Sequence, residues 1–176
     1  MVRRSILELV PPDAVRHALL IAGQSMQITR AEKQHIPGVA RLFDLYRQFY
    51  ECDPDYELAE RFISQRMHND ESIIFVAVDD DGTAAGFTQL YPSFCSVEAV
   101  KILILYDLYV DASYRKHGVG RQLMNRATDY ARETGAARLD LLTHETNKPG
   151  QALYESLGYH RANSDFYAYS LDVNSS

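Results

Sequence analysis

One segment in the second half of the chain joins a long strand pattern, a glycine-containing loop and a helix. Residues 102–110 are rich in apolar, β-branched and aromatic side chains, which predicts a strand. Residues 118–134 predict a helix with one apolar face that is closed by Gly135. Apolar side chains recur there every four residues, at Val119, Leu123, Ala127 and Ala131. The chain must therefore pass from a strand into a helix through the loop between them.

This loop, residues 111–121, is called the glycine loop below. Gly118 and Gly120 let backbone N–H groups approach a ligand closely, and the positive end of the helix dipole lies at the same place. Basic side chains that a diphosphate can use are also present: Arg115, Lys116 and Arg121. Taken alone, the pattern fits a phosphate site and a plain left-handed turn equally well. It lacks the Gly-Lys-Ser/Thr ending of a P-loop and the third glycine of a dinucleotide fingerprint.

The rest of the chain predicts further strands and helices around this unit. Strands are expected over residues 26–29, 72–78, 84–91, 139–143 and 166–171. Helices are expected over residues 36–50, 56–67 and 149–157. The turn sequence at 79–82 makes a hairpin of the two strands beside it. The order predicts an α+β (mixed α/β) fold, with a mostly antiparallel, partly mixed sheet flanked by helices.

Length and composition predict one compact domain in a chain of 176 residues. Prolines and a glycine set residues 1–25 apart as an N-terminal extension of a domain over residues 26–176. The net charge of -6 argues against nucleic acid as a partner. No stretch approaches the roughly 18 to 20 apolar residues of a membrane span, and two cysteines are too few for a disulfide framework. We expect a cytoplasmic protein with no membrane partner.

Two stretches resemble the conserved blocks of the GNAT N-acetyltransferase superfamily. Residues 107–110 and 114–124 resemble its acetyl-CoA motif, Arg/Gln-x-x-Gly-x-Gly/Ala. Residues 147–159 resemble its second block and follow at the expected distance. Two blocks in register are more specific than one, and the order of segments agrees over residues 26–173. The resemblance implies a GNAT-like fold and the transfer of an acetyl group from acetyl-CoA to an amine, with no metal.

The resemblance also implies which residues hold the cofactor. Its pyrophosphate would be bound by the glycine-loop residues Arg115, Lys116, His117, Gly118, Val119, Gly120 and Arg121. Its pantetheine arm would lie along the backbone of Leu108, Tyr109 and Val110, and would also use Asn147. Asn147 suits a helix cap equally well. The small residue that the family usually has after its arginine is replaced here by Lys116-His117, which alters the expected phosphate contacts.

Two residues are expected to carry the chemistry. Tyr154 matches the tyrosine of the family's second block and would protonate the leaving thiolate; its other reading is a tyrosine packed between a helix and a sheet. Asp107 is the one charged residue in the strand 102–110, where an unpaired carboxylate is costly. It either accepts the amine proton, directly or through water, or serves as a structural hydrogen-bond acceptor.

The acceptor is the least constrained part of the prediction. The end of the strand 102–110 and residues 90–94 are similar to acetyltransferases of polyamines, diamines and other small amines. An acidic turn favours a cationic amine or is simply solvated; it contains Glu51, Asp53, Asp55 and Glu57, with Tyr50 and Tyr56 between them. We therefore expect a small primary amine and direct transfer in a ternary complex. The alternatives are a protein or peptide amine and a non-catalytic acyl-CoA-binding module. Similar proteins are often homodimers.

Overall fold

The structure is a computed structural model that describes residues 25–162 and 169–173. The described residues form two compact units that divide between Leu142 and Thr143. The first unit contains β1 (Gln27–Arg30), α2 (Ile36–Phe49), α3 (Tyr56–His68), β2 (Ile73–Val78), β3 (Ala84–Cys95), β4 (Val100–Val110), α4 (Val119–Glu133) and β5 (Leu139–Leu141). Short 3-10 turns cover Lys33–His35 and Ala112–Tyr114. The second unit contains α5 (Lys148–Ser156).

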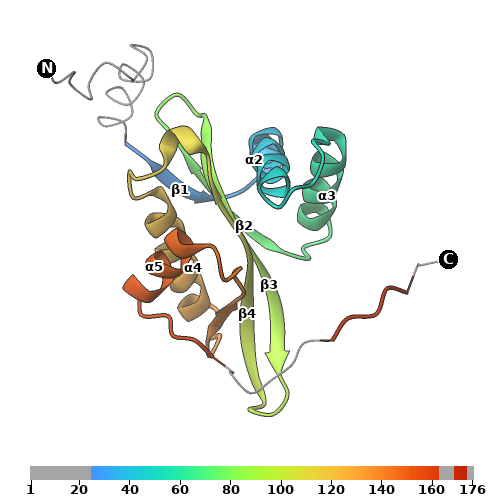
Figure 1. The fold of residues 1–176 in the computed structure, drawn as a ribbon, viewed down its shortest axis with the longest axis vertical. Helices are drawn as coiled ribbons and strands as arrows, with labels where there is room; N and C mark the ends of the chain where they lie inside the picture. Colours follow the sequence, from blue (N-terminus) through green and yellow to red (C-terminus); the bar gives the residue numbers. More distant parts are fainter. Residues whose placement is uncertain (1–24, 163–168, 174–176) are drawn as a thin grey trace, which may run out of the picture. The chain divides into compact units, whose positions relative to one another are not determined.

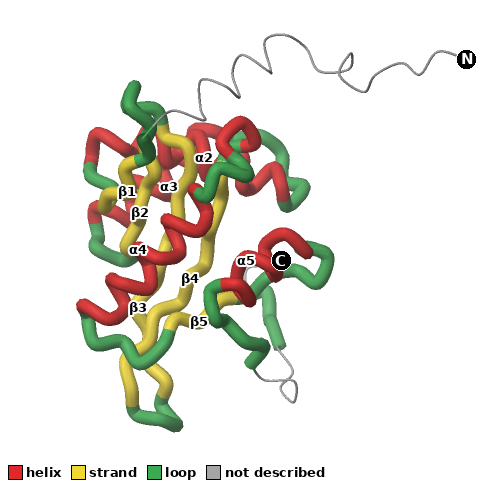
Figure 2. The backbone as a smooth tube through the Cα atoms, turned by 90° about the vertical axis from the view of Figure 1, so that its left-hand side faces the viewer, coloured by secondary structure: helices red, strands yellow, loops and turns green. Residues whose placement is uncertain are grey.

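The five strands form one sheet in the order β1-β2-β3-β4-β5. Neighbouring strands are antiparallel, except that β4 and β5 are parallel and are connected through α4. Figures 1 and 2 show α2 and α3 on one face of this sheet and α4 on the other. The predicted α+β fold with a mostly antiparallel, mixed sheet is confirmed.

Strand β2 is buried on both faces, as its uninterrupted apolar sequence predicts. Ile74 and Val76 pack into the core beneath α2 and α3. The ring of Phe75 lies on the other face, 5.6 Å from the ring of Tyr130 in α4. Because side chains alternate along a strand, β2 contributes to both cores and fixes the two helical layers against one sheet.

Helix α4 lies very close to the sheet at Gly86 of β3. A Cβ atom at this position would lie 2.9 Å from the carbonyl oxygen of Tyr109 and 3.2 Å from a methyl carbon of Leu123. Any side chain there would push α4 away from β3 and β4. Gly86 thus sets the place of the helix whose N-terminus follows the glycine loop.

Strand β3 is longer than its sequence predicts, because it continues through Pro92 to Cys95. Pro92 pairs with Leu103 of β4, and the N–H of Leu103 donates to the carbonyl of Arg138 instead of to β3. The pair is therefore not hydrogen-bonded, so the missing N–H of proline removes no bond of the ladder. The prediction that the strand ends at residue 91 was wrong for this reason.

At the C-terminal end of the chain, the predicted strand over residues 166–171 is not confirmed. Residues 169–171 belong to no helix or strand, and residues 166–168 lie outside the described residues. Within the described part, no helix is long and apolar enough to cross a membrane. The N-terminal extension predicted over residues 1–25 lies outside the described residues, apart from Ser25.

Candidate active site

A cavity of about 570 Å³ lies in the first unit, between α2 and α3 on one side and β3 and β4 on the other. Its walls are mostly aromatic or aliphatic, and two charged side chains line it as well. The lining residues are Phe43, Tyr46, Arg47, Leu58, Phe62, Tyr91, Ile104, Tyr106 and Asp107. A cavity of this size and composition is typical of a site for a small molecule.

A β-bulge places Asp107 in this cavity. Gln89 of β3 pairs with Asp107, whereas the next residue, Leu90, pairs with Leu105, so that Tyr106 is an extra residue on β4. Tyr106 is 66% exposed, whereas Asp107 beside it is only 5% exposed. The bulge thus directs one carboxylate inward from a strand that is otherwise apolar at its centre.

The carboxylate of Asp107 is held by neighbouring polar side chains. The Nε2 atom of Gln89 donates to Asp107 Oδ2 at 2.9 Å and to the hydroxyl of Tyr91 at 2.8 Å. Burial raises the pKa of Asp107, and hydrogen bonds from Gln89 and Tyr46 offset this effect only in part. The side chain is therefore a stronger base than an exposed aspartate, and it borders a cavity that can hold an amine.

The glycine loop ends at the N-terminus of α4, as predicted. Gly118 is the N-cap residue with φ of 81°, and it provides no side-chain cap for the N–H groups of the first turn. A Cβ atom on Gly118 would meet nothing within 4 Å, so the positive φ, not a lack of space, favours glycine here. The first turn of α4 therefore presents backbone donors and the positive end of a helix dipole.

Lys116 also has a positive φ, of 66°, although it is not glycine. This is the position where the resemblance leads one to expect a small residue. An L-residue in the left-handed region costs about 1–2 kcal/mol, so the lysine carries a backbone strain that glycine would not have. Lys116 and its neighbour His117 are both exposed.

Arg115 lies back along the strand that precedes the loop. Its Nε donates to the carbonyl of Val110 at 2.9 Å, and its guanidinium lies 5.4 Å from the centre of the Tyr109 ring.

In the sheet, β5 pairs with β4 only at residues 103–105. Within the described residues, the rest of β4 thus has a strand partner on its β3 side alone, which leaves one backbone edge for a ligand arm.

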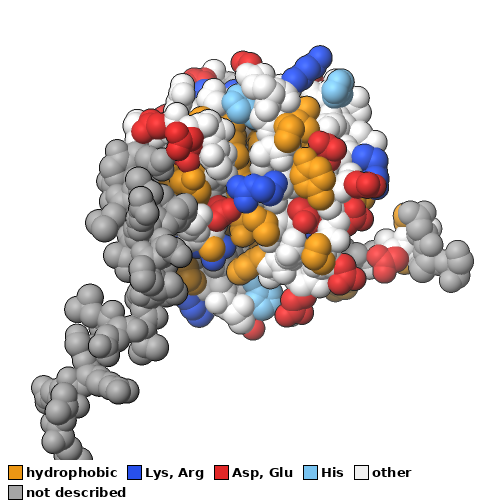
Figure 3. Space-filling view, turned by 90° about the horizontal axis from the view of Figure 1, so that it is seen from above, with side chains coloured by type: hydrophobic (Ala, Val, Ile, Leu, Met, Phe, Trp, Pro, Cys, Tyr) orange, Lys and Arg blue, Asp and Glu red, His pale blue; other side chains and the backbone are white. Residues whose placement is uncertain are grey.

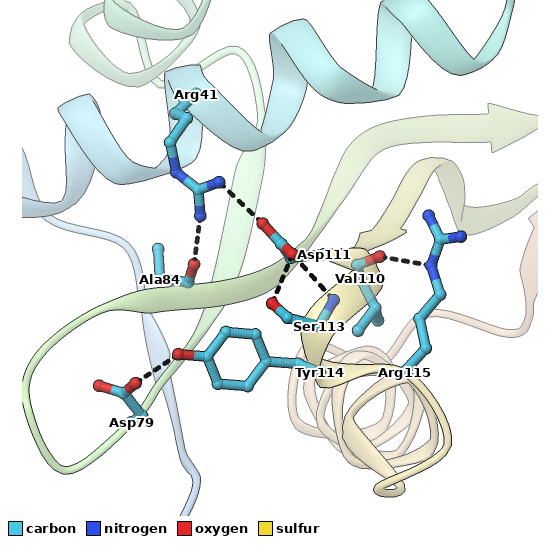
Figure 4. A network of polar contacts seen from close by, with 8 residues as sticks. All are labelled: Arg41, Asp79, Ala84, Val110, Asp111, Ser113, Tyr114 and Arg115. Atoms are coloured by element: carbon cyan, nitrogen blue, oxygen red, sulfur yellow. Dashed lines mark hydrogen bonds and ion pairs between the residues drawn. The ribbon is translucent and has the colours of Figure 1, made fainter. Parts of the chain in front are cut away.

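A polar network ties the start of the glycine loop to α2 and to β3 (Figure 4). Arg41 of α2 donates to Asp111 Oδ2 and to the carbonyl of Ala84, both at 2.8 Å. Asp111 Oδ1 accepts from the N–H and the hydroxyl of Ser113, at 3.1 and 2.7 Å. Burial would raise the pKa of Asp111, but Arg41 and Ser113 outweigh it and hold that pKa below its usual range. The first turn of the loop is thus fixed to the helix–sheet core.

A second anchor of the loop is Tyr114, which is buried and reaches the β2–β3 hairpin (Figure 4). Its hydroxyl donates to Asp79 Oδ2 at 2.6 Å, and Asp79 Oδ1 accepts from the N–H groups of Asp81 and Thr83. Burial and the carboxylate of Asp79 raise the pKa of Tyr114 to about 12. The tyrosine therefore remains a donor at physiological pH and holds the loop to the hairpin.

Two of the predicted site residues, Asn147 and Tyr154, belong to the second unit. Asn147 is the N-cap of α5: its Oδ1 accepts from the N–H of Gly150 at 3.2 Å, and its Nδ2 donates to Thr143 Oγ1 at 3.0 Å. Tyr154 lies in α5, and its ring centre is 6.2 Å from that of Tyr159. The helix-cap reading of Asn147 is thus confirmed, whereas its role toward a cofactor stays a prediction.

The predicted acidic turn does not line the cavity. Of its residues, Asp55 caps α3 by accepting from the N–H of Leu58 at 2.9 Å, and its own N–H donates to Asp44 Oδ1 at 2.8 Å. Leu58 is the lining residue nearest to the turn in sequence. The turn thus positions α3 through helix capping, and the charge at the cavity comes from Asp107 and Arg47.

Several residues of the site have no signal in the sequence that identifies them. Tyr46 is one of several aromatic residues in the predicted helix 36–50, and Gln89 lies in the predicted strand 84–91 without a motif around it. Arg41 stands in no motif, and Asp79 belongs to the sequence that predicts the hairpin turn at 79–82. One signal was available, because Asp111 directly follows a strand and precedes Ser113 by two residues, a spacing typical of an Asx turn.

The molecular surface offers little to a large polyanion on the side seen in Figure 3. There, basic side chains are interspersed with acidic and apolar ones, and the atoms described on that face form no continuous basic patch.

Residues 25–162 and 169–173 contain no group of three or more His, Cys, Asp or Glu side chains that could hold a metal ion.

Comparisons with known proteins agree with this arrangement. Residues 39–159 match the model of the acetyltransferase (GNAT) family. An uncharacterized N-acetyltransferase, YhfO of Bacillus subtilis (strain 168), is 40% identical over 84% of this chain and 98% of its own. The streptothricin acetyltransferase of Streptomyces lavendulae is 37% identical over 51% of this chain and 45% of its own. A crystal structure of a probable acetyltransferase has a TM-score of 0.77 and 35% identity, and covers 85% of this chain and 99% of that one. The chain therefore belongs to the GNAT family and is an acetyl-CoA-dependent N-acetyltransferase.

Proposed function

We propose that this enzyme transfers the acetyl group directly to a primary amine of a small molecule, in a complex that holds both substrates together. The observation that carries the proposal is Asp107, a buried carboxylate in the wall of a mostly aromatic cavity of about 570 Å³. An amine arrives in water as an ammonium ion, which a carboxylate and tyrosine rings attract. The amine must then lose a proton before it can react.

The glycine loop and β4 fit the cofactor in three respects. The N-terminus of α4 has no side-chain cap, so its donors suit the pyrophosphate, together with Lys116 and Arg121. The backbone edge of β4 at residues 108–110 suits the amide groups of the pantetheine arm. The loop is held rigid by Asp111 and Tyr114. When bound, acetyl-CoA supplies a thioester whose carbonyl carbon an amine can attack.

Asp107 is proposed as the group that accepts the proton of the amine, directly or through one water molecule. Its raised pKa makes it a better acceptor than a free aspartate, and Gln89 fixes the orientation of the carboxylate. The new C–N bond replaces the C–S bond, and the departing thiolate then needs a proton. Tyr154 is proposed to donate that proton, because it matches the tyrosine of the family's second block.

A small acceptor is favoured over a protein amine by the walls of the cavity. Rings from α2, α3, β3 and β4 line it, with few polar groups that could bind a peptide backbone. A likeness to streptothricin acetyltransferase, whose name refers to one small molecule, points the same way. The similarity to polyamine and diamine acetyltransferases, the cytoplasmic location and the homodimer stay predictions.

Release of free thiol from acetyl-CoA tests this proposal across a panel of acceptors. The panel contains aromatic and aliphatic primary amines, diamines, a polyamine, amino acids and lysine-containing peptides. We expect turnover with at least one small amine that exceeds the rate of hydrolysis without acceptor. Turnover with the peptides alone would contradict the proposal of a small acceptor, and hydrolysis at the same rate with every acceptor would contradict amine transfer as such.

A further inference from the structure

We propose that the acceptor carries a carboxylate as well as its amine, on an apolar or aromatic frame, and that Arg47 binds this carboxylate at the cavity. The substrate class is thus an amino carboxylate and not a polyamine. The inference rests on the proposed function, because it concerns the acceptor of the same cavity. It is carried by the position and the contacts of Arg47.

Arg47 follows Tyr46 on α2 and lines the cavity, with its side chain 21% exposed. It is the cationic member of the lining, as Asp107 is the anionic member. A guanidinium group has five N–H donors in a planar fork that matches the two oxygens of a carboxylate. The remaining lining residues have no charge, so these two side chains set the charge pattern that a ligand meets.

The contact of Arg47 with its neighbour Asp44 uses little of this capacity. Its Nη1 atom lies 3.5 Å from Asp44 Oδ1, a long ion pair between positions i and i+3 of α2. Asp44 has two closer donors, at 2.8 Å each: the side-chain amide of Gln48 and the N–H of Asp55. In the described part of the chain, Asp44 is the one carboxylate within ion-pair distance of Arg47. Within the described residues, Arg47 forms no other side-chain ion pair, so most donors of its guanidinium can bind a ligand that reaches them.

The other cation close to the aromatic wall is already compensated. Arg66 covers the ring of Phe62 at 4.7 Å and forms an ion pair with Glu71. The Phe62 ring also stacks on Phe43, with 5.1 Å between the centres and 9° between the planes. Both rings line the cavity together with Arg47 and Asp107, so their stack gives it an apolar wall that suits the hydrocarbon or aromatic frame of a ligand.

The charge pattern distinguishes between classes of amine. An amino carboxylate places its ammonium group beside Asp107 and its carboxylate beside Arg47, so both side chains gain an opposite charge. A polyamine would instead bring a second positive charge toward Arg47, which is unfavourable in a partly buried site. A simple amine would leave the donors of Arg47 that Asp44 does not use without a ligand partner. The cavity should therefore prefer the amino carboxylate over a matched amine that lacks the carboxyl group.

Calorimetric titration in the presence of CoA tests this preference without turnover. The probes are matched pairs with and without a carboxyl group: phenylalanine and phenethylamine, leucine and isoamylamine, 6-aminohexanoate and pentylamine, with spermidine as the polyamine. For at least one pair we expect the amino carboxylate to bind about tenfold tighter or more, because a site built for a polar group discriminates against an analogue that lacks it. Equal affinity within every pair, or tightest binding by spermidine, would overturn the inference.

Variants of Arg47 identify the residue responsible. Arg47→Gln should abolish the preference within a pair, and Arg47→Lys should keep only part of it, because lysine retains the charge but loses the planar fork. Arg61→Gln on α3 is the control: its side chain is 61% exposed and it should leave the preference unchanged. An unchanged preference in Arg47→Gln would exclude this role. Thiol release distinguishes this inference from the proposed function. Turnover of phenethylamine without any preference for phenylalanine would refute the amino carboxylate as acceptor but not the transfer of acetyl to a small amine.

Discussion

The side-chain amide of Gln89 donates to the carboxylate of Asp107 at 2.9 Å, from the position directly opposite on the neighbouring strand. The same nitrogen donates to the hydroxyl of Tyr91, and Gln89 Oε1 accepts from Ser72 at 3.1 Å. The amide therefore cannot rotate without losing bonds on both of its sides. Asp107 is thus held in one orientation toward the cavity.

The variant Gln89→Leu tests whether this bond tunes the pKa of Asp107. The bond stabilises the ionised carboxylate, so its loss should raise the pKa further. We expect the acidic limb of the kcat/KM profile to move upward by about one pH unit, since one unit corresponds to about 1.4 kcal/mol. Thr88→Val is the control, because Thr88 donates to the backbone carbonyl of Asp107 and not to its carboxylate. An acidic limb that moves equally in both variants would speak against the tuning.

The variant Tyr114→Phe tests the anchoring of the glycine loop. It removes the 2.6 Å bond to Asp79, whose buried carboxylate then loses a donor, at a cost of about 1–3 kcal/mol in the free energy of unfolding. We expect a lower Tm and a higher KM for acetyl-CoA, with a smaller effect on the KM for the amine. Tyr130→Phe keeps the ring contact with Phe75 and serves as the matched control. A raised KM for the amine alone would contradict a role in the cofactor site.

The variant Lys116→Gly separates backbone strain from charge. Glycine relieves the strain at φ of 66° but increases the entropy of the unfolded chain, so the free energy of unfolding should change by less than about 1 kcal/mol. The Kd for acetyl-CoA should rise about three- to tenfold, because a charge near the phosphates is lost. Lys116→Arg should keep the affinity. If the Kd of Lys116→Gly equals that of the wild type, this lysine does not contact the phosphates.

The variant Tyr154→Phe tests the proposed acid. Phenylalanine keeps the ring but has no proton to donate to the thiolate. We expect kcat to fall by about 10²-fold or more, with the Kd for acetyl-CoA nearly unchanged. Tyr159→Phe, which alters the neighbouring ring of the same unit, is the control. Unchanged turnover in Tyr154→Phe would remove this residue from the mechanism.

The parts of the fold that depend on local chemistry were predictable from the sequence. Gly118 is predicted to begin a helix, either at a phosphate site or in a plain left-handed turn; its positive φ at the N-cap of α4 shows the left-handed backbone that favours glycine, and the phosphate site stays a prediction. Asp107 was recognised because a charge in an apolar strand requires a partner. Its partner Gln89 was not, since their alignment depends on the β-bulge at Tyr106 of β4, which leaves no mark in the sequence.

The lining of the cavity was the least predictable part. The sequence predicts a helix over residues 36–50, but its helical period does not show that Tyr46 and Arg47 border a cavity shared with β4. The acidic turn drew attention by its charge, whereas Asp55 serves as the cap of α3. Such contacts between distant segments follow from how helices pack on the sheet, which periodicity within one segment does not encode.

The thermal stability of the variant Asp107→Asn shows whether a loss of its activity comes from the missing carboxylate or from unfolding. The pKa of Asp107 is raised in the folded state, so its contribution to stability is fully present below the unfolded pKa and is lost as pH rises through the folded pKa. At neutral pH the buried charge is therefore a cost that asparagine does not have. We expect a Tm at neutral pH no lower than that of the wild type, with Gln89 still donating to the amide oxygen.

The most direct measurement is kcat/KM for an amine acceptor as a function of pH, at saturating acetyl-CoA, for the wild type and Asp107→Asn. Loss of a general base costs about 10²–10⁴-fold in rate. We predict a loss in this range for the folded variant, together with disappearance of the acidic limb that the wild type shows. An acidic limb that is unaltered in Asp107→Asn would contradict the role of this carboxylate as the base at the cavity.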